Sequence, residues 1–179
     1  ISKERILIEL YKILDLKNLT ELNNSTDLKE IFIMIFPEFK NLGRLERLNK
    51  ICDFSQVNKS LLLAALLIDD QATHEYFAHK YNISNNIKDA LNSFAKDLKL
   101  IKEDKDFFNK NLEKNIYLND KNYLTSLNIL NFVINTREKL KETSNIFKRI
   151  LKSKTHKFSI DGKYLLENGM KQGSLIGKV

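Results

Sequence analysis

Few residues in this chain are of the types that hold metals or act as acids and bases, and their spacing argues against such a site. His74 and His79 lie five positions apart, whereas two ligands on one helical face lie four apart. Cys52, the single cysteine, is distant from both in the sequence. Asp69 and Asp70 form a carboxylate pair, but they follow an apolar stretch, where a polar helix exit is expected. We therefore predict no bound metal and no catalytic residue within this chain.

A better candidate for a functional pair lies near the N-terminus. Arg5 and Glu9 are four residues apart, the spacing at which helical side chains become neighbours and can form an ion pair. Such a pair could hold a rigid surface. On spacing alone, the simpler interpretation is an ordinary exposed pair, which contributes roughly a few tenths of a kcal/mol.

Positive charge is concentrated at the C-terminal end. Residues 1–136 contain 19 basic and 19 acidic residues, whereas residues 137–179 contain 11 basic and 4 acidic residues, so the net charge of +7 lies in the last 43 residues. This asymmetry predicts a polyanion-facing segment on a neutral scaffold. The alternative is a solvated basic helix that serves solubility.

The scaffold that positions these residues is predicted to be helical. Its 179 residues are 42% hydrophobic, enough to bury a core, and one proline and five glycines leave few of the turns that all-β proteins need. The longest charge-free apolar run, at residues 61–68, is far shorter than the about 20 residues that span a bilayer. The leucines of this run, with Phe107 and Phe108, are predicted core. The lone Cys52 permits no internal disulfide and fits a reducing cytoplasm, where we expect the protein.

Helix signals recur along the chain. Ser2 is placed to cap a first helix, whose apolar face is formed by Ile6, Leu7, Leu10, Ile13 and Leu14. Asp27 and Glu30 have capping-box spacing, and Pro37 ends the helix that they would begin. Further helices are predicted over residues 43–52, 59–68, 71–81, 84–100, 105–115, 120–135 and 138–152, with two short ones at 162–167 and 173–179.

The C-terminal segment, residues 158–179, contains four of the five glycines. Asp161 can cap a short helix that Gly169 ends. Gly173 and Gly177 flank the start of another helix, where backbone amides could face phosphate. A Gly-containing turn between two short helices is typical of helix–hairpin–helix nucleic-acid motifs.

The chain contains, in this order, the segments ISKERILIEL and IFPEF, LLLAALLIDD, and IDGKYLLENGMKQGSLIGKV. In sequence and in order, these segments resemble bacterial tRNA nucleotidyltransferases and poly(A) polymerases. Residues 1–39, with ISKERILIEL and IFPEF, resemble the helical neck that follows the catalytic head of that family. LLLAALLIDD resembles the body, and IDGKYLLENGMKQGSLIGKV resembles the closing element. The resemblance runs along most of the chain. It departs from the family pattern at Tyr164, where an Asp is usual, and at Ser174, where a proline is usual.

The resemblance implies that the chemistry lies outside this chain. Such enzymes transfer nucleotides from CTP and ATP to an RNA 3′ end, with a head domain whose carboxylates hold divalent ions. The chain has neither a Gly-Ser turn followed by Asp-x-Asp nor the Glu-Asp-x-x-Arg nucleotide-reading segment. No cofactor is therefore expected in this segment, and Mg²⁺ and ATP or CTP are expected only with the head. The family's Arg-x-x-x-Glu helix is matched by Arg5 and Glu9, to which the resemblance assigns support of the nucleotide-reading surface.

We predict an all-α helical array made of a neck (1–52), a body (53–153) and a Gly-rich basic tail (154–179). It would bind the elbow and acceptor side of tRNA through phosphates and 2′-hydroxyls. The predicted phosphate contacts are Lys148, Arg149, Lys152, Lys154, Lys157, Lys163 and Lys171. The head would lie upstream on the natural chain or on a separate polypeptide. An opening without methionine, inside a motif, favours a piece of a longer chain, and the chain could also form a homodimer.

Two other functions fit the same sequence. One is a helix–hairpin–helix-like DNA-binding module, which predicts comparable affinity for duplex DNA and tRNA. The other is a helical protein–protein scaffold whose basic tail serves solubility. The sequence does not distinguish CCA addition from poly(A) addition.

Overall fold

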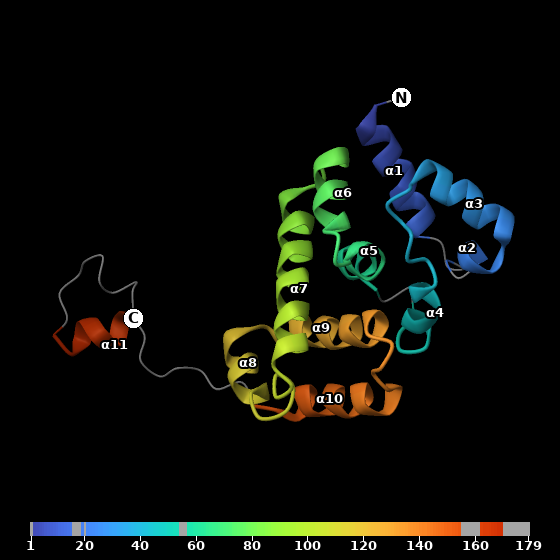
Figure 1. Ribbon diagram of the computed structural model, residues 1–179. Coiled ribbons are helices and arrows are strands. Elements are labelled where there is room, and N and C mark those ends of the chain that lie inside the picture. Colours follow the sequence, from blue (N-terminus) through green and yellow to red (C-terminus); the bar gives the residue numbers. More distant parts are fainter. Residues whose placement is uncertain (1, 16–18, 20, 54–56, 155–161, 170–179) are drawn as a thin grey trace.

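The protein is all-α, as its composition predicts. The computed structural model describes residues 2–15, 19, 21–53, 57–154 and 162–169, and these ranges contain helices and no strand (Figure 1). The helices are α1 (Lys3–Leu14), α2 (Glu21–Asn24), α3 (Thr26–Ile35), α4 (Arg44–Asn49), α5 (Lys59–Leu67), α6 (Thr73–Tyr81), α7 (Asn85–Glu103), α8 (Leu112–Leu118), α9 (Lys121–Ile134), α10 (Leu140–Lys152) and α11 (Gly162–Glu167). None of these helices is long and apolar enough to cross a bilayer.

The first helix forms as its sequence predicts. The Ser2 hydroxyl accepts a hydrogen bond from the backbone N–H of Arg5 at 3.3 Å, which satisfies one donor at the open end of α1. On the opposite side from solvent, Leu10 and Leu14 are 0% and 4% exposed. The apolar face of α1 is therefore placed correctly by its spacing.

The start of α3 differs from the prediction. The cap is Ser25, whose hydroxyl accepts from the N–H of Leu28 at 3.4 Å, so the helix begins before Asp27. The capping-box spacing of Asp27 and Glu30 was therefore misleading, because a serine two residues earlier supplies the acceptor. The predicted end is confirmed, since α3 stops at Ile35, just before Pro37.

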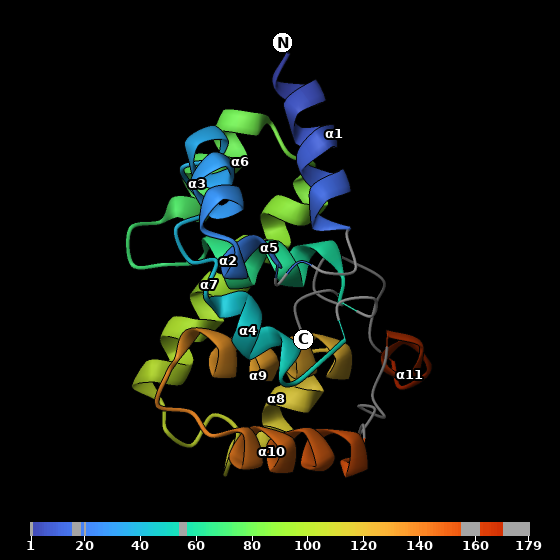
Figure 2. The same ribbon diagram turned by 90° about the vertical axis from the view of Figure 1, so that its right-hand side faces the viewer.

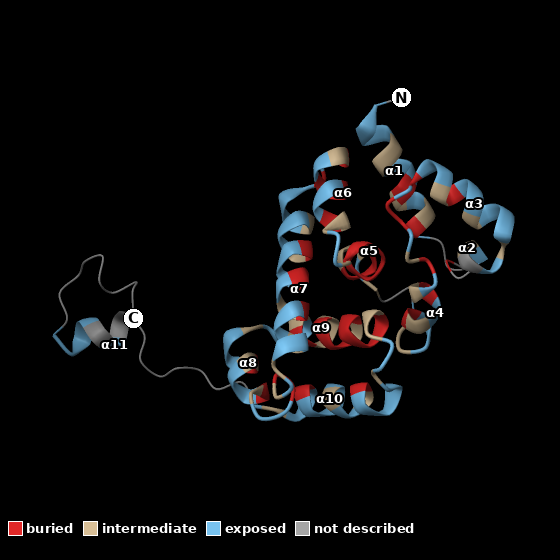
Figure 3. Ribbon diagram, viewed as in Figure 1, coloured by how far each residue is buried: buried red, intermediate tan, exposed pale blue. Residues whose placement is uncertain are grey.

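The centre of the core is α5, which is apolar on all sides. Every residue from Leu61 to Leu67 is buried, as the leucine-rich run predicts. Figure 1 shows α5 end-on, with α6 and α7 on one side and α1 and α4 on the other. Figure 3 shows that α5 is largely buried and that α7 and α9, among other helices, carry buried residues. One contiguous cluster reaches from Leu10 to Ile150, so the predicted neck and body share a core.

Aromatic packing joins the segment around Pro37 to α6. Phe39 meets Phe32 at 5.4 Å and Phe77 at 5.5 Å between ring centroids, both edge to face. Beside these rings, the Lys80 ammonium lies 2.6 Å from the carboxylate of Glu38, which is buried. The IFPEF segment is thereby fixed against α6.

The short helix α4 anchors the C-terminal end of α5. The Arg44 guanidinium donates from Nη1 to the carbonyl oxygens of Ala65, at 3.0 Å, and Ile68, at 2.7 Å. The last carbonyls of a helix lack internal partners and carry partial negative charge, so a cation there is stabilising.

Arg47, one turn later in α4, binds carbonyl oxygens at the C-terminal end of α9. Arg47 donates from Nε to Phe132 O at 3.0 Å and from Nη2 to Asn135 O at 3.1 Å and Glu138 O at 3.3 Å. Its guanidinium also lies 4.3 Å above the centroid of the Phe132 ring. The ends of α5 and α9 therefore converge on α4, an arrangement visible from the side in Figure 2.

The helix predicted over residues 105–115 was wrong in its first half. Residues 105–111 form turns, and α8 begins only at Leu112. The Asp104 carboxylate accepts from the N–H of Asp106 at 2.8 Å and from Nδ2 of Asn111 at 2.9 Å, which competes with helical bonding. Phe107 and Phe108 are nevertheless buried, as predicted.

The chain then forms a pair of helices, α9 and α10, packed side by side (Figures 1 and 2). Asn128 donates from Nδ2 to the carbonyl of Thr143 at 2.9 Å inside this interface. Beyond α10, the short helix α11 is followed by Gly169 in the left-handed region at φ 91°, which confirms the predicted glycine stop. The helix predicted over 173–179 lies outside the described residues.

Candidate functional site

Arg5 and Glu9 do not form the ion pair that their spacing predicts. Arg5 and Glu9 are both exposed on α1. Glu9 pairs instead with Lys12, at 2.9 Å between Oε1 and Nζ, and the Arg5 side chain makes no ion pair within the described part of the chain. The three-residue spacing to Lys12 is as favourable as the four-residue spacing to Arg5, and sequence alone cannot choose between them.

In the fold, the two histidines differ in burial, and Asp69 of the aspartate pair has a structural role. His79 is exposed and His74 is buried. The Asp69 carboxylate accepts from the backbone N–H groups of Gln71 and Thr73, at 3.0 and 3.1 Å, and from the Thr73 hydroxyl at 2.6 Å. Asp69 therefore fixes the turn that leads into α6. Among the described residues, no three His, Cys, Asp or Glu side chains are grouped to hold a metal ion.

The lysines predicted to meet phosphate are available at the end of α10. Lys148, Lys152 and Lys154 are exposed, and no carboxylate of the described chain pairs with them. Lys163 lies on α11, although its side chain is not described, and Lys157 and Lys171 lie outside the described residues.

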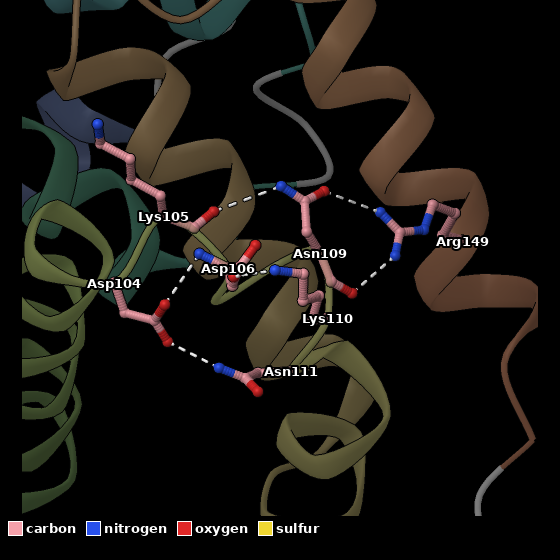
Figure 4. Close-up of polar contacts among 7 residues, drawn as sticks. All are labelled: Asp104, Lys105, Asp106, Asn109, Lys110, Asn111 and Arg149. Carbon is pink, nitrogen blue, oxygen red and sulfur yellow. Dashed lines mark hydrogen bonds and ion pairs between the residues drawn. The ribbon is translucent and has the colours of Figure 1, made fainter.

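Arg149, also predicted to meet phosphate, is exposed but already makes hydrogen bonds within the protein. Figure 4 shows its guanidinium facing Asn109 in the loop between α7 and α8. Nη1 donates to the Asn109 side-chain oxygen at 3.2 Å, and Nη2 donates to the Asn109 backbone carbonyl at 2.9 Å. Through these two bonds, Arg149 holds that loop against α10, although its side chain is exposed.

A second row of cations, which the sequence analysis missed, lies along α7. The row consists of Lys88, Lys96, Lys99 and Lys102, at spacings that place them on one side of the helix. They line an open hollow of about 1080 Å³ between α6, α7 and the C-terminal ends of α5 and α9. Lys102 pairs with Asp70 at 3.2 Å. Lys88, Lys96 and Lys99 have no carboxylate partner in the described part of the chain.

This hollow continues toward α10. It shares Lys102, Asn135 and Arg137 with a second hollow of about 820 Å³. The second shares Asn109 and Arg149 with a third, of about 350 Å³, that reaches Lys152. We call these three connected hollows the α7 furrow. The furrow joins the lysines of α7 to the C-terminal end of α10.

His74 lies in the wall of the furrow. It is 5% exposed, and its Nδ1 is buried without a hydrogen-bond partner among the described residues. Its Nε2 lies 3.9 Å from the Glu75 carboxylate. Burial lowers the pKa of the imidazole, Glu75 and Asp69 oppose that shift, and Lys99 adds to it. The ring is therefore neutral at pH 7.

The count of charges along the sequence concealed the row on α7. Its lysines alternate with Asp89 and Asp97, which cancel them in a linear count. In the folded chain, the Asp97 carboxylate accepts a hydrogen bond from the Tyr123 hydroxyl of α9 at 2.8 Å, on another side of α7. At about 100° per residue, Asp97 falls on another side of α7 than the lysines, but Asp89 falls within about 20° of Lys96 and Glu103 falls between Lys96 and Lys99. A helical projection therefore separates the two signs only in part.

No known protein family, curated protein or solved structure matches the chain. The assignment of function therefore depends on the residues and the geometry described above. Exposed lysines on α10 and the lysines that line the furrow suit the binding of a polyanion.

Proposed function

We propose that this chain is the RNA-holding helical region of a tRNA nucleotidyltransferase, an enzyme that adds CCA or A from CTP and ATP to an RNA 3′ end. The observation that carries the proposal is the end of α10. There Lys148, Lys152 and Lys154 are exposed and lack carboxylate partners in the described chain. Residues 148–157 of the sequence contain five basic residues and no acidic one.

A helical scaffold suits this task because A-form RNA is recognised mainly by its shape and backbone. Each lysine offers three donors to phosphate oxygens, and phosphate contacts fix the position of an RNA without reading its sequence. The rigid packing of α10 on α9 would hold the lysine spacing constant. Affinity would come largely from the release of counterions.

The chemistry would take place in a catalytic head on the natural chain or on a separate polypeptide, with Mg²⁺ and the nucleotide bound there. Arg5 and Glu9 remain our proposed support for the nucleotide-reading surface. Both are exposed on α1, where a neighbouring domain could contact them. Glu9 would then exchange its present partner, Lys12, for that domain or for Arg5.

A second candidate function, that of a protein–protein scaffold, is favoured by one feature of α3. Four apolar side chains at helical spacing are exposed there, namely Leu28, Ile31, Met34 and Ile35, at 48%, 53%, 79% and 56%. Apolar rows of this kind mark protein contacts. The row is compatible with the main proposal if the head or a second copy of the chain covers it.

The main proposal is tested by the binding of labelled tRNA, followed by fluorescence anisotropy over a range of salt concentrations. If about five cations neutralise phosphates, log K should fall against log[salt] with a slope of roughly −4. The triple variant K148Q/K152Q/K154Q should flatten that slope by roughly 2 to 3. Deletion of residues 157–179, which removes four lysines, should also flatten it while the helical circular dichroism persists.

Two results would contradict the proposal. Absence of tRNA binding at low salt would favour the scaffold, and equal affinity for a DNA duplex would favour the helix–hairpin–helix alternative. The matched control is K40Q/K50Q/K114Q, because these three lysines are exposed and lie outside the furrow and α10. It removes the same charge and should leave the slope nearly unchanged.

A further inference from the structure

We propose that the α7 furrow binds the sugar–phosphate backbone of duplex RNA as a second track that continues from the lysines of α10. This inference rests on the proposed function and adds the place where the backbone would run. It assigns roles to Lys88, Lys96 and Lys99, residues that neither the charge distribution nor the resemblance indicated.

The first support is the arrangement of unpaired charge. Lys88, Lys96 and Lys99 follow one side of α7 over eleven residues, which at 1.5 Å per residue is about 16 Å. Three carboxylates also line the first hollow, those of Asp69, Asp70 and Glu75, but six basic side chains line it too. The excess of positive charge in a concave surface raises the local concentration of anions. A run of phosphates on one RNA strand presents charge over a comparable length.

The second support is the chemistry of the furrow walls. They carry asparagine side chains from the end of α6, from α7 and from the C-terminal part of α9, including Asn82, Asn92, Asn131 and Asn135. An amide side chain both donates and accepts, as phosphate oxygens and 2′-hydroxyls require. The first hollow is lined by His74 and His79 but by no Phe, Tyr or Trp among the described residues. Phe107 and Phe108 line the second hollow, but both are buried. The first hollow, with its lysines and asparagines, therefore fits a backbone better than unpaired bases.

The third support is continuity. Asn109 and Arg149 line both the second and the third hollow, and Lys152 also lines the third. Arg149 holds the loop that forms this part of the wall, by its two bonds to Asn109. Because neighbouring hollows share lining residues from the end of α10 to α6, a duplex lying on the end of α10 could extend along α7 toward α6.

The test compares the triple variant K88Q/K96Q/K99Q with the matched control K40Q/K50Q/K114Q. Binding of a labelled RNA hairpin is measured by anisotropy between low and moderate salt. The α7 variant should bind about tenfold or more weakly at low salt, and its salt slope should shrink by roughly 2 to 3. The control should match the wild type, and K88R/K96R/K99R should keep the wild-type slope because it keeps the charge.

The outcomes separate this inference from the proposed function. Loss of binding in K148Q/K152Q/K154Q, with an unchanged slope in the α7 variant, would overturn the second track and leave the proposed function standing. A wild type that binds no RNA would overturn both. Tighter binding of single-stranded RNA, or equal binding of a DNA hairpin of the same sequence, would overturn the assignment of duplex RNA. Circular dichroism verifies that all variants keep their helices.

Discussion

On α1, Leu10 and Arg5 have opposite surroundings, and this contrast gives the first prediction. Leu10 is 0% exposed, so Leu10→Ala should lower the free energy of unfolding by about 2–5 kcal/mol through the lost burial and the cavity left behind. Arg5 is exposed and makes no ion pair within the described chain, so Arg5→Ala should cost less than about 0.5 kcal/mol. Urea unfolding measures both, and equal losses would contradict the assigned face of the helix.

His74 gives a prediction about pH. Its pKa is lowered from 6.5 in the folded chain, chiefly by burial. The unfolded chain therefore binds the proton more readily, so this contribution to stability is complete above about pH 6.5 and is lost as the pH falls toward the lowered pKa. Between pH 7 and pH 5, the wild type should lose more free energy of unfolding than His74→Leu. Identical pH dependence in urea unfolding of the two proteins would show that another group is responsible.

At the scale of single residues, the sequence predicted which side chains are exposed better than it predicted their hydrogen-bond and ion-pair partners. The lysines at the end of α10 are exposed, as their charge indicates, and Leu10 is buried, as its spacing indicates. The partners of Arg149 and Glu9 were missed. Asn109 lies 40 residues from Arg149 in the sequence, and no local pattern marks such a contact.

At the scale of helices, local sequence signals predicted a helix boundary correctly where a single residue determines it. They failed where side-chain hydrogen bonds compete with those of the helix. Pro37 stops α3 because its ring excludes a helical residue before it. Asp104 instead draws the following residues into turns, although their composition suits a helix. The lysine row on α7 was missed for a different reason: Asp89, Asp97 and Glu103 of the same helix cancel the lysines in a count along the sequence.

The two arginines of α4 give a prediction at the same scale. Arg47 uses a planar, multi-donor guanidinium to bond three carbonyl oxygens and to stack on Phe132. Lysine has a single ammonium and cannot reproduce this geometry. Arg47→Lys should therefore lower the free energy of unfolding by about 1–3 kcal/mol, as lost hydrogen bonds to a charged group do.

The control for that substitution is Arg137→Lys. The Arg137 side chain is exposed and makes no ion pair within the described residues, so the change should stay within about 0.5 kcal/mol. Thermal or urea unfolding gives both values. Similar values for the two substitutions would mean that α4 does not hold the end of α9.

For the molecule as a whole, the proposed function predicts that this chain alone transfers no nucleotide. The described part holds no group of carboxylates suited to metal ions, and the sequence has no Gly-Ser turn followed by Asp-x-Asp. Purified chain is incubated with Mg²⁺, labelled ATP and a tRNA that lacks its terminal A. Label incorporated above a heat-inactivated control would refute the prediction.

The bonds from α4 also bear on how the chain would fold as a ribosome makes it. Arg47 and its acceptor Glu138 are 91 residues apart, which corresponds to roughly 5–20 s of synthesis. During that interval α5, apolar on every side, would lack the cover that α9 provides. The nascent chain would therefore expose an apolar, leucine-rich helix, and chaperones that bind apolar segments could act on it during that interval.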